Sequence, residues 1–182
     1  MRIVAGSARG RKLAAPDGPD TRPTSDRVRE AMFNALYSLD DVVADATVLD
    51  LFAGTGALGL EALSRGAAHA VFVERNPRAL RALEQNIDTT GTDRTAVTVV
   101  RADAVDWLAR RVGHESFDLA LLDPSYDFAA WPDLLAVLPA TLAVIESNRD
   151  LTDELATAAW EIVRHRRYGA TVVTMVRRLP PA

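Results

Sequence analysis

Three closely spaced glycines follow the first strongly apolar run of the sequence. A buried strand is predicted for residues 47–52, and Gly54, Gly56 and Gly59 come immediately after it. Glycine lets a backbone turn tightly and approach a ligand closely, and the free N–H groups at the start of a helix attract polar or charged atoms. This spacing, after a strand and before a helix, is typical of a loop that binds a nucleotide-like cofactor.

Acidic side chains stand at the ends of the predicted strands around that loop. Asp50 precedes the glycines, Glu74 ends the next strand, and Asp103 follows the third. A carboxylate at Asp50 disfavours a bound pyrophosphate but suits the positive amino and sulfonium groups of S-adenosylmethionine. Glu74 stands where an adenosyl cofactor or a dinucleotide would have its ribose hydroxyls bound. The glycine spacing fits both cofactors, so an NAD-dependent oxidoreductase remains an alternative.

The fourth predicted strand ends in a motif of a different kind. Residues 123–126, Asp-Pro-Ser-Tyr, place a carboxylate, a rigid turn and an aromatic ring at the carboxyl end of that strand. Alone, such a motif is an ordinary turn. It indicates a site here because ligands of parallel sheets bind beyond the carboxyl ends of successive strands. A hydride-transfer site has no counterpart to this motif, which therefore favours methyl transfer.

Alternating strands and helices must position these groups. Apolar runs predict strands over residues 47–52, 70–74, 96–100, 117–123, 141–145, 161–166 and 171–176. Helices are expected from Thr24 or Ser25, over 57–65, from Asn76-Pro77, over about 104–112 and near 151–159, and the last two strands form a hairpin at Tyr168-Gly169. Such alternation produces right-handed βαβ units. The predicted fold class is α/β, with a largely parallel seven-stranded sheet covered by helices on both faces.

The composition narrows the function classes. The chain has 182 residues, a net charge of −4, three histidines and no cysteine. The absence of cysteine excludes disulfides and cytosine methylation through a cysteine nucleophile, and the scattered histidines lack ligand spacing, so no metal is expected. No apolar run approaches the ~20 residues of a membrane span, and the start lacks a signal peptide. We therefore expect a cytoplasmic protein that does not bind a membrane.

Further motifs connect the N-terminal segment with the glycine loop and the later strands. They are Arg2 to Gly6, Arg9 to Leu13, Arg22-Pro23-Thr24 through Phe33, Leu49 through Ala67, Phe72-Val73-Glu74, Asp103-Ala104 and Arg167-Tyr168-Gly169. Together they resemble class I methyltransferases of the RsmD type over nearly the whole chain. The resemblance implies a Rossmann-like sheet that binds S-adenosylmethionine and releases S-adenosylhomocysteine. It implies cofactor contacts from Asp50, Phe52, Gly54, Thr55, Gly56, Glu74, Arg75, Asp103 and Ala104.

The resemblance also implies a reaction, methylation of the exocyclic N2 of a guanine in 16S ribosomal RNA. Asp123 and the Pro124 carbonyl would accept the two amino hydrogens, and Tyr126 would stack on the base. The family usually has a second proline where this chain has Ser125, which makes the loop less rigid. The expected substrate is the small ribosomal subunit or its assembly intermediate, bound by a monomer.

Other acceptors remain open at the sequence level. An Asp-Pro-x-aromatic motif serves the amino group of adenine N6 as well as guanine N2, and only the resemblance favours guanine. A small-molecule or protein acceptor would use the same cofactor loop. A non-catalytic RNA-binding module that retains the pocket is a third alternative, which Ser125 keeps open.

Positive charge is concentrated near the N-terminus. Residues 1–13 contain three arginines and one lysine but no acid. We expect residues 1–24 to form a basic extension, a β-hairpin arm that contacts RNA, ahead of a methyltransferase domain over residues 25–182. A solvated surface explains the same charges. The candidate RNA-binding residues are Arg9, Arg11, Lys12, Arg22, Arg27 and Arg29.

Overall fold

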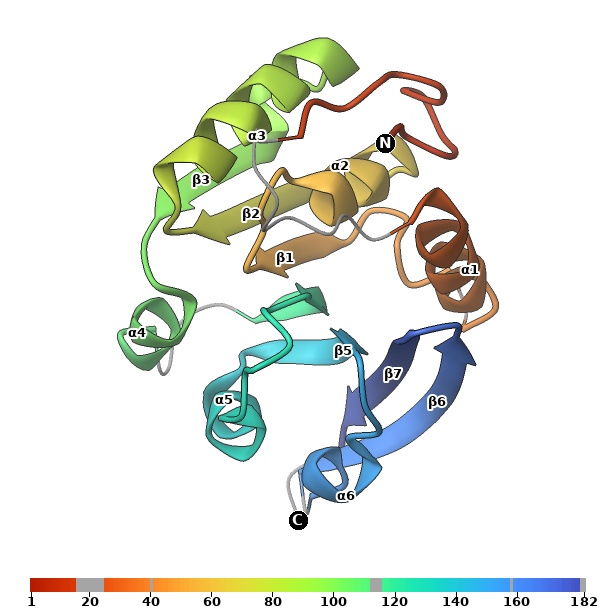
Figure 1. The fold of residues 1–182 in the computed structure, drawn as a ribbon, viewed down its shortest axis with the longest axis vertical. Coiled ribbons are helices and arrows are strands. Elements are labelled where there is room, and N and C mark those ends of the chain that lie inside the picture. The colour runs from red at the N-terminus through yellow and green to blue at the C-terminus, as the bar shows by residue number, and fades with distance from the viewer. Residues whose placement is uncertain (16–24, 40, 112–115, 158, 181–182) are drawn as a thin grey trace.

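A computed structural model describes residues 1–15, 25–39, 41–111, 116–157 and 159–180 (Figure 1). These residues form one sheet from β1 (Thr47–Leu51), β2 (His69–Glu74), β3 (Val97–Arg101), β4 (Phe117–Leu122), β5 (Ala140–Ser147), β6 (Trp160–Tyr168) and β7 (Thr171–Arg178). The order is β3-β2-β1-β4-β5-β7-β6. Strands β1 to β5 pair in parallel, and β7 is antiparallel to both of its neighbours. The predicted α/β class and the predicted strands are confirmed.

Helices cover both faces of the sheet (Figure 1). One core lies under α1 (Asp26–Tyr37), α2 (Ala57–Ser64) and α3 (Pro77–Thr90), and the other under α4 (Ala104–Ala109), α5 (Trp131–Val137) and α6 (Thr152–Leu155). Alternate strand residues supply the two cores: Leu119 and Leu121 join the first, whereas Ala120 and Leu122 join the second. A 3₁₀ turn, η1 (Arg94–Ala96), precedes β3. None of the described helices is long and apolar enough to cross a membrane.

The helix starts follow the capping chemistry of the sequence. The Ser25 hydroxyl accepts a hydrogen bond from the Val28 N–H, and the Asn76 side chain caps α3 with Pro77 in the first position. Asp103 caps α4 in the same way. These side chains satisfy backbone N–H groups that a helix leaves without an internal partner. Of the two N-caps predicted for the first helix, Thr24 or Ser25, the structure has Ser25, and the starts predicted at Asn76-Pro77 and near Ala104 are confirmed.

Two helices differ from the prediction. The helix α5 is not predicted from the sequence, because a proline such as Pro132 usually interrupts a helix. Here Pro132 lies in the first turn of the helix, where its missing N–H would have had no hydrogen-bond partner within the helix. The helix expected near 151–159 is only four residues long, since Leu155 ends it and β6 begins at Trp160. Both differences arise where a short helix fills a connection between strands.

The N-terminal segment, residues 1–15, packs against α2 and α3. Arg2 and Lys12 form an antiparallel bridge, and Ile3 and Leu13 are buried in the first core. The tip of the segment donates from the Ser7 N–H to the Ser64 carbonyl at 2.8 Å. A Cβ at Gly6 would lie 1.7 Å from that carbonyl oxygen, so only glycine fits this contact. The described part of the predicted basic arm is therefore integrated into the domain.

Candidate cofactor and acceptor site

The carboxylates predicted at the strand ends meet on one face of the sheet. Asp50 in β1 lies opposite Phe72 of β2 and Leu121 of β4. Glu74 and Asp123 come two residues after these partners, and residues two apart in a strand point to the same face. All three therefore lie at the carboxyl edge of the sheet, on the side covered by α2.

Asp50 is an unusually placed carboxyl group. Its side chain is buried, and burial raises its pKa well above the ordinary aspartate value, with further raising from the nearby Asp123 and Glu74 carboxylates. The Gly59 N–H donates to its Oδ2 at 2.8 Å and partly opposes that rise. A cationic ligand group beside Asp50 would stabilise the ionised carboxylate, which is the electrostatic requirement of an ammonium or sulfonium site.

The glycine loop is held in place by these same acids. Gly54 has a φ of 56° and donates its N–H to Glu74 Oε2 at 2.8 Å. The other Glu74 oxygen accepts from the Arg75 and Asn76 N–H groups at 2.8 and 2.7 Å. Gly59 is packed so closely that an added Cβ would lie 2.4 Å from the Phe72 ring. The loop is therefore a tight, preorganised turn between β1 and α2.

A cleft opens beside this loop at the ends of β1 to β4. It brings together six of the predicted residues and several neighbours, and is lined by Phe52, Val73, Glu74, Arg75, Ala102, Asp103, Ala104, Val105, Pro124, Ser125 and Phe128. Arg75 donates to Asp103 Oδ2 at 2.9 Å and so joins the ends of β2 and β3. The mixture of apolar walls and fixed carboxylates suits a nucleoside.

Phe128 is a lining residue that the sequence interpretation missed. Its ring lies 5.3 Å from the Phe52 ring and 4.8 Å from the Trp131 ring, both in edge-on geometry. Phe52 has a φ of 66°, a conformation that bulky residues rarely adopt. The signal available in the sequence was the pair of aromatics three residues apart, Phe128 and Trp131, directly after the Asp-Pro motif. Their contact with Phe52 depends on the tertiary fold.

The Asp-Pro motif separates the cleft from a second hollow. Pro124 and Ser125 line the cleft, whereas the hollow is lined by Ser125, Tyr126, Phe128, Trp131, Glu146, Ser147, Asn148, Arg149 and Leu151. The Tyr126 side chain is 38% exposed, which is high for an aromatic ring beside a site. An exposed ring three residues after Asp123 offers a stacking surface for a planar acceptor.

Ser125 contributes to the turn that carries this motif. Its carbonyl accepts from the Phe128 N–H at 2.9 Å, and a hydrogen bond from its hydroxyl lowers the pKa of Asp127. The hydroxyl thus supports the turn from within. Among the described residues no group of three or more histidine, aspartate or glutamate side chains is arranged to hold a metal ion.

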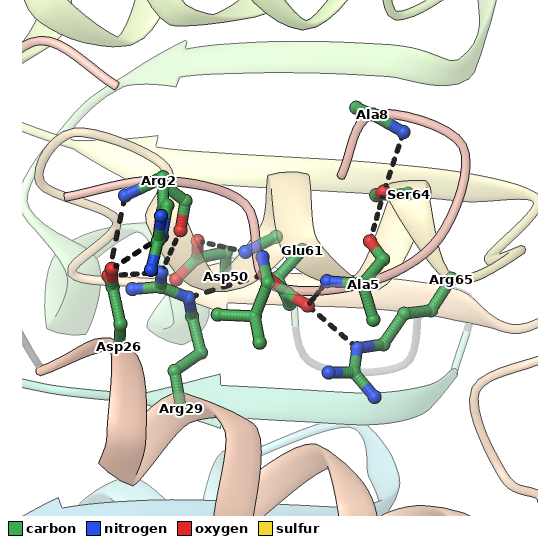
Figure 2. A network of polar contacts seen from close by, with 11 residues as sticks. Arg2, Ala5, Ala8, Asp26, Arg29, Asp50, Glu61, Ser64 and Arg65 are labelled. Atoms are coloured by element: carbon green, nitrogen blue, oxygen red, sulfur yellow. Dashed lines mark hydrogen bonds and ion pairs between the residues drawn. The ribbon is translucent and has the colours of Figure 1, made fainter. Parts of the chain in front are cut away.

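Arg29 corrects one sequence-based expectation. The residue was predicted to face RNA, but its side chain is 0% exposed and lies in a polar network (Figure 2). Its Nε donates to Glu61 at 3.3 Å, and its Nη2 donates to Asp26 at 2.8 Å and to the Arg2 carbonyl. A guanidinium committed to buried acceptors is not available to phosphate, so Arg29 is a structural residue.

Glu61 is the centre of that network, and the sequence interpretation did not single it out. Its carboxylate is 0% exposed and accepts from the Val4 and Ala5 N–H groups at 2.8 and 3.0 Å. It also accepts from Arg65 at 2.7 Å, in addition to Arg29 (Figure 2). One buried side chain of α2 therefore fixes both α1 and the N-terminal segment.

The remaining predicted RNA-binding residues lie at different places. Arg9, Arg11, Lys12 and Arg27 are exposed, whereas Arg22 lies outside the described residues. Arg9 follows Ala8, whose N–H is bound by the Ser64 hydroxyl at the end of α2. Since α2 runs eight residues away from the glycine loop, about 12 Å, the tip of the N-terminal segment is directed away from the carboxyl edge of the sheet.

The chain is similar to known proteins over most of its length. It is 40% identical to Escherichia coli "Ribosomal RNA small subunit methyltransferase D" over 154 residues, which cover 85% of this chain and 71% of that protein. It is 35% identical to the Bacillus subtilis protein YlbH, with 98% and 99% covered. The solved structure of E. coli yhhF superposes with a TM-score of 0.81 at 35% identity, covering 98% of this chain and 97% of that one.

The fold defines a class I S-adenosylmethionine-dependent methyltransferase, because the strand order places a single antiparallel strand, β7, between β5 and β6. The family described as "Conserved hypothetical protein 95" matches residues 1–177. The chain therefore belongs to this family, the RsmD family of methyltransferases.

Proposed function

We propose that this chain transfers the methyl group of S-adenosylmethionine to the exocyclic N2 of a guanine in 16S ribosomal RNA. The observation that carries the proposal is the motif that begins at Asp123, directly after β4: Pro124 lines the cofactor cleft and Tyr126 lines the exposed hollow, in a chain of the RsmD family. The relative in E. coli is named for methylation of small-subunit ribosomal RNA. We infer a cytoplasmic monomer that acts on the small subunit or an assembly intermediate.

Each side of the cleft has a role in cofactor binding under this proposal. Asp50 and the loop Gly54-Thr55-Gly56 are next to the cleft and are not part of its lining; from there they would hold the amino acid part, where the cofactor carries positive charge. Glu74 accepts three backbone hydrogen bonds, two on Oε1 and one on Oε2, so about one acceptor site remains on Oε2 for a ribose hydroxyl. The adenine would lie in the cleft against the touching Phe52 and Phe128 rings, with Asp103, the Ala104 backbone and Arg75 available to its edge.

The acceptor side explains how a weak nucleophile is activated. The lone pair of a guanine amino group is delocalised into the ring. The Asp123 carboxylate and the Pro124 carbonyl accept its two hydrogens, which favours a tetrahedral nitrogen with its lone pair directed at the methyl group. The new N–C bond forms as the S–C bond breaks, sulfur keeps the electron pair, and the surplus proton leaves through Asp123 to solvent. Positioning of this kind supplies roughly 7–11 kcal/mol.

The exposed cations hold the RNA in this scheme. Residues 1–24 serve as a basic extension to the domain formed by residues 25–182, with residues 1–15 packed against that domain. The exposed candidates for phosphate contacts are Arg9, Arg11 and Lys12 in this extension and Arg27 in α1. Phosphate contacts fix the register of a nucleic acid without reading its sequence. Base access requires an unpaired or extruded guanine, at a cost of a few kcal/mol.

Labelled S-adenosylmethionine tests the proposal directly. Unmodified small subunits, naked 16S RNA and large subunits are supplied in parallel, and the methylated nucleoside is identified. We expect N2-methylguanosine in the small subunits or the naked 16S RNA and none in the large subunits. N6-methyladenosine would assign the other amino acceptor, and absence of transfer to any RNA by a protein that binds the cofactor would overturn the proposal.

A further inference from the structure

A dense group of cations lies at the end of β6 and is not explained by the proposed roles above. Residues 164–167 read Arg-His-Arg-Arg, and Tyr168, Gly169 and Ala170 then turn the chain into β7. This basic hairpin end, residues 164–170, stands out in a chain whose net charge is −4. Its position in the sheet determines whether these positive charges can contact an RNA bound at the acceptor hollow.

The hairpin end lies at the catalytic edge of the sheet. Because β7 is antiparallel to both β5 and β6, β6 runs parallel to β5 and ends at the same edge. The register aligns Glu146 with Val173 and Val173 with Arg166. Asp123 continues β4 next to Glu146, so Arg166 lies three strands from Asp123, about 14 Å at the ~4.8 Å spacing of strands.

A continuous surface connects the hairpin end with the candidate stacking residue. Asn148 and Arg149 share the hollow with Tyr126. The next residue, Asp150, approaches His165 at 3.6 Å. The loop after β5 therefore bridges the acceptor hollow and the basic hairpin end, and a strand of RNA can pass from one to the other without leaving the protein surface.

The two arginines nearest the turn are available for a ligand. Arg166 and Arg167 are both exposed, and within the described residues neither guanidinium forms an ion pair within 4.0 Å. Arg167 is still close enough to Asp150 to contribute, after the hydrogen bonds from Thr152 and the charge of His165, to the lowered pKa of that carboxyl. In contrast, Arg94 and Arg149 are each paired with acids of the chain. The tip of the N-terminal segment is directed away from this edge, so its cations do not cover the acceptor hollow.

We propose that Arg166 and Arg167 bind the phosphates flanking the target base, as a phosphate-binding surface on the β5 side of the acceptor hollow. The inference rests on the proposed function, because it places an RNA strand across that hollow. Adjacent strand residues point to opposite faces of a sheet, so Arg166 lies on the face that carries Asp123 and Arg167 on the other face. The two cations therefore flank the edge of the sheet about 14 Å from the reacting group, where each can bind a different phosphate of an RNA strand that runs along this edge. The surface binds backbone and therefore adds affinity without choosing the base.

Protection of an edge strand is the rival explanation, since charged side chains on an edge keep it from pairing with other chains. Two variants separate the explanations. R166Q/R167Q removes the charges, whereas R166E/R167E keeps a charged edge but repels phosphate. The matched control is R81Q/R110Q, which removes two exposed arginines, one in α3 and one directly after α4, that also form no ion pair among the described residues.

The test measures binding of 16S RNA to the full chain saturated with S-adenosylhomocysteine, over a series of salt concentrations, alongside methyl transfer. We expect R166Q/R167Q to raise the RNA Kd roughly five- to ten-fold and to lower the slope of log K against log salt by about 1.4–1.8. R166E/R167E should bind more weakly still. The affinity for S-adenosylhomocysteine, the melting temperature and the kcat at saturating RNA should match those of the control.

Equal RNA affinity and salt slope in all variants would overturn the proposal and leave the hairpin end as edge protection. That outcome is distinct from failure of the proposed function. If the wild-type chain methylates RNA and the variants bind RNA with normal affinity, only the proposed role of the hairpin end is refuted. A wild-type chain that binds RNA through these arginines but transfers no methyl group refutes only the reaction.

Discussion

Asp123 and Pro124 present two hydrogen-bond acceptors at the end of β4, and activation of an amino group requires both. Asp123→Ala removes the carboxylate, so methyl transfer should fall by at least about 10²-fold. The Kd for S-adenosylhomocysteine, measured calorimetrically, should stay within about two-fold, because the cleft is lined by other residues. Asp133→Ala, at an exposed acid in α5, is the control. Parallel loss of cofactor binding would make Asp123 a structural residue.

The raised pKa of Asp50 predicts that its ionised carboxylate lowers the stability of the cofactor-free protein while it strengthens cofactor binding. Since the pKa in the folded state lies above the unfolded value, this carboxyl favours folding at low pH, and that contribution is lost as the pH rises through the folded pKa. Asp50→Asn keeps an acceptor for Gly59 without the buried charge. In cofactor-free melts the variant should be more stable than wild type near about pH 8, with a smaller gap near about pH 4.

The same substitution should weaken the cofactor. Without a carboxylate, the positive groups of S-adenosylmethionine lose their electrostatic partner, so its Kd should rise while the apo protein becomes more stable. A gain of about 1 kcal/mol corresponds to roughly 2–4 °C in Tm for a chain of this size. A pH-independent difference in Tm would show that Asp50 does not carry the buried charge.

The site residues that can be predicted from the sequence are those that follow the ends of strands. Asp50, Glu74 and Asp103 follow apolar runs, and parallel strands bring such positions to one edge. Burial of Arg29 was harder to foresee, although it stands four residues before Phe33 on the apolar stripe of α1. Its decisive partner, Glu61, is 32 residues away, and no local pattern connects the two.

At the scale of elements, α1 is attached to the domain through Arg29. Arg29→Ala leaves part of the buried Glu61 carboxylate without a donor, which should cost about 3–5 kcal/mol of unfolding free energy. Arg27→Ala, at an exposed position in the same helical turn, should change stability by less than about 0.5 kcal/mol. The measurement is urea unfolding of both variants. Equal unfolding midpoints would show that the polar network around Glu61 does not stabilise the fold.

The elements that sequence predicted well are those with local signals. Apolar runs located the strands, and Ser25, Asn76 and Asp103 located helix starts, because capping is a contact between residues two or three apart. The short helices α5 and α6 carry too few residues for a periodic pattern. Docking of residues 1–15 on α2 and α3 depends on contacts that only the folded chain creates.

At the scale of the molecule, ligand-induced stabilisation separates the two cofactor classes that share a glycine loop. At about 100 times its Kd, a ligand stabilises a fold by ≈ 2.7 kcal/mol, which is roughly 5–11 °C in Tm here. S-adenosylhomocysteine should produce such a shift and NADH should not. The measurement is a thermal melt with each ligand, and a shift with NADH alone would contradict the assignment of the cleft.

The packing of the N-terminal segment also sets an order of events during synthesis. Ala8 and Ala14 are bound by Ser64 and Asn86, which lie 56 and 72 residues further along the chain. At ~5–20 residues per second, Asn86 is synthesised roughly 4–14 s after Ala14. Ile3 and Leu13 meanwhile lack the core that later buries them. Nascent chains of this protein therefore expose a short apolar and basic segment until half of the domain has been translated, which is the interval in which a chaperone can bind it.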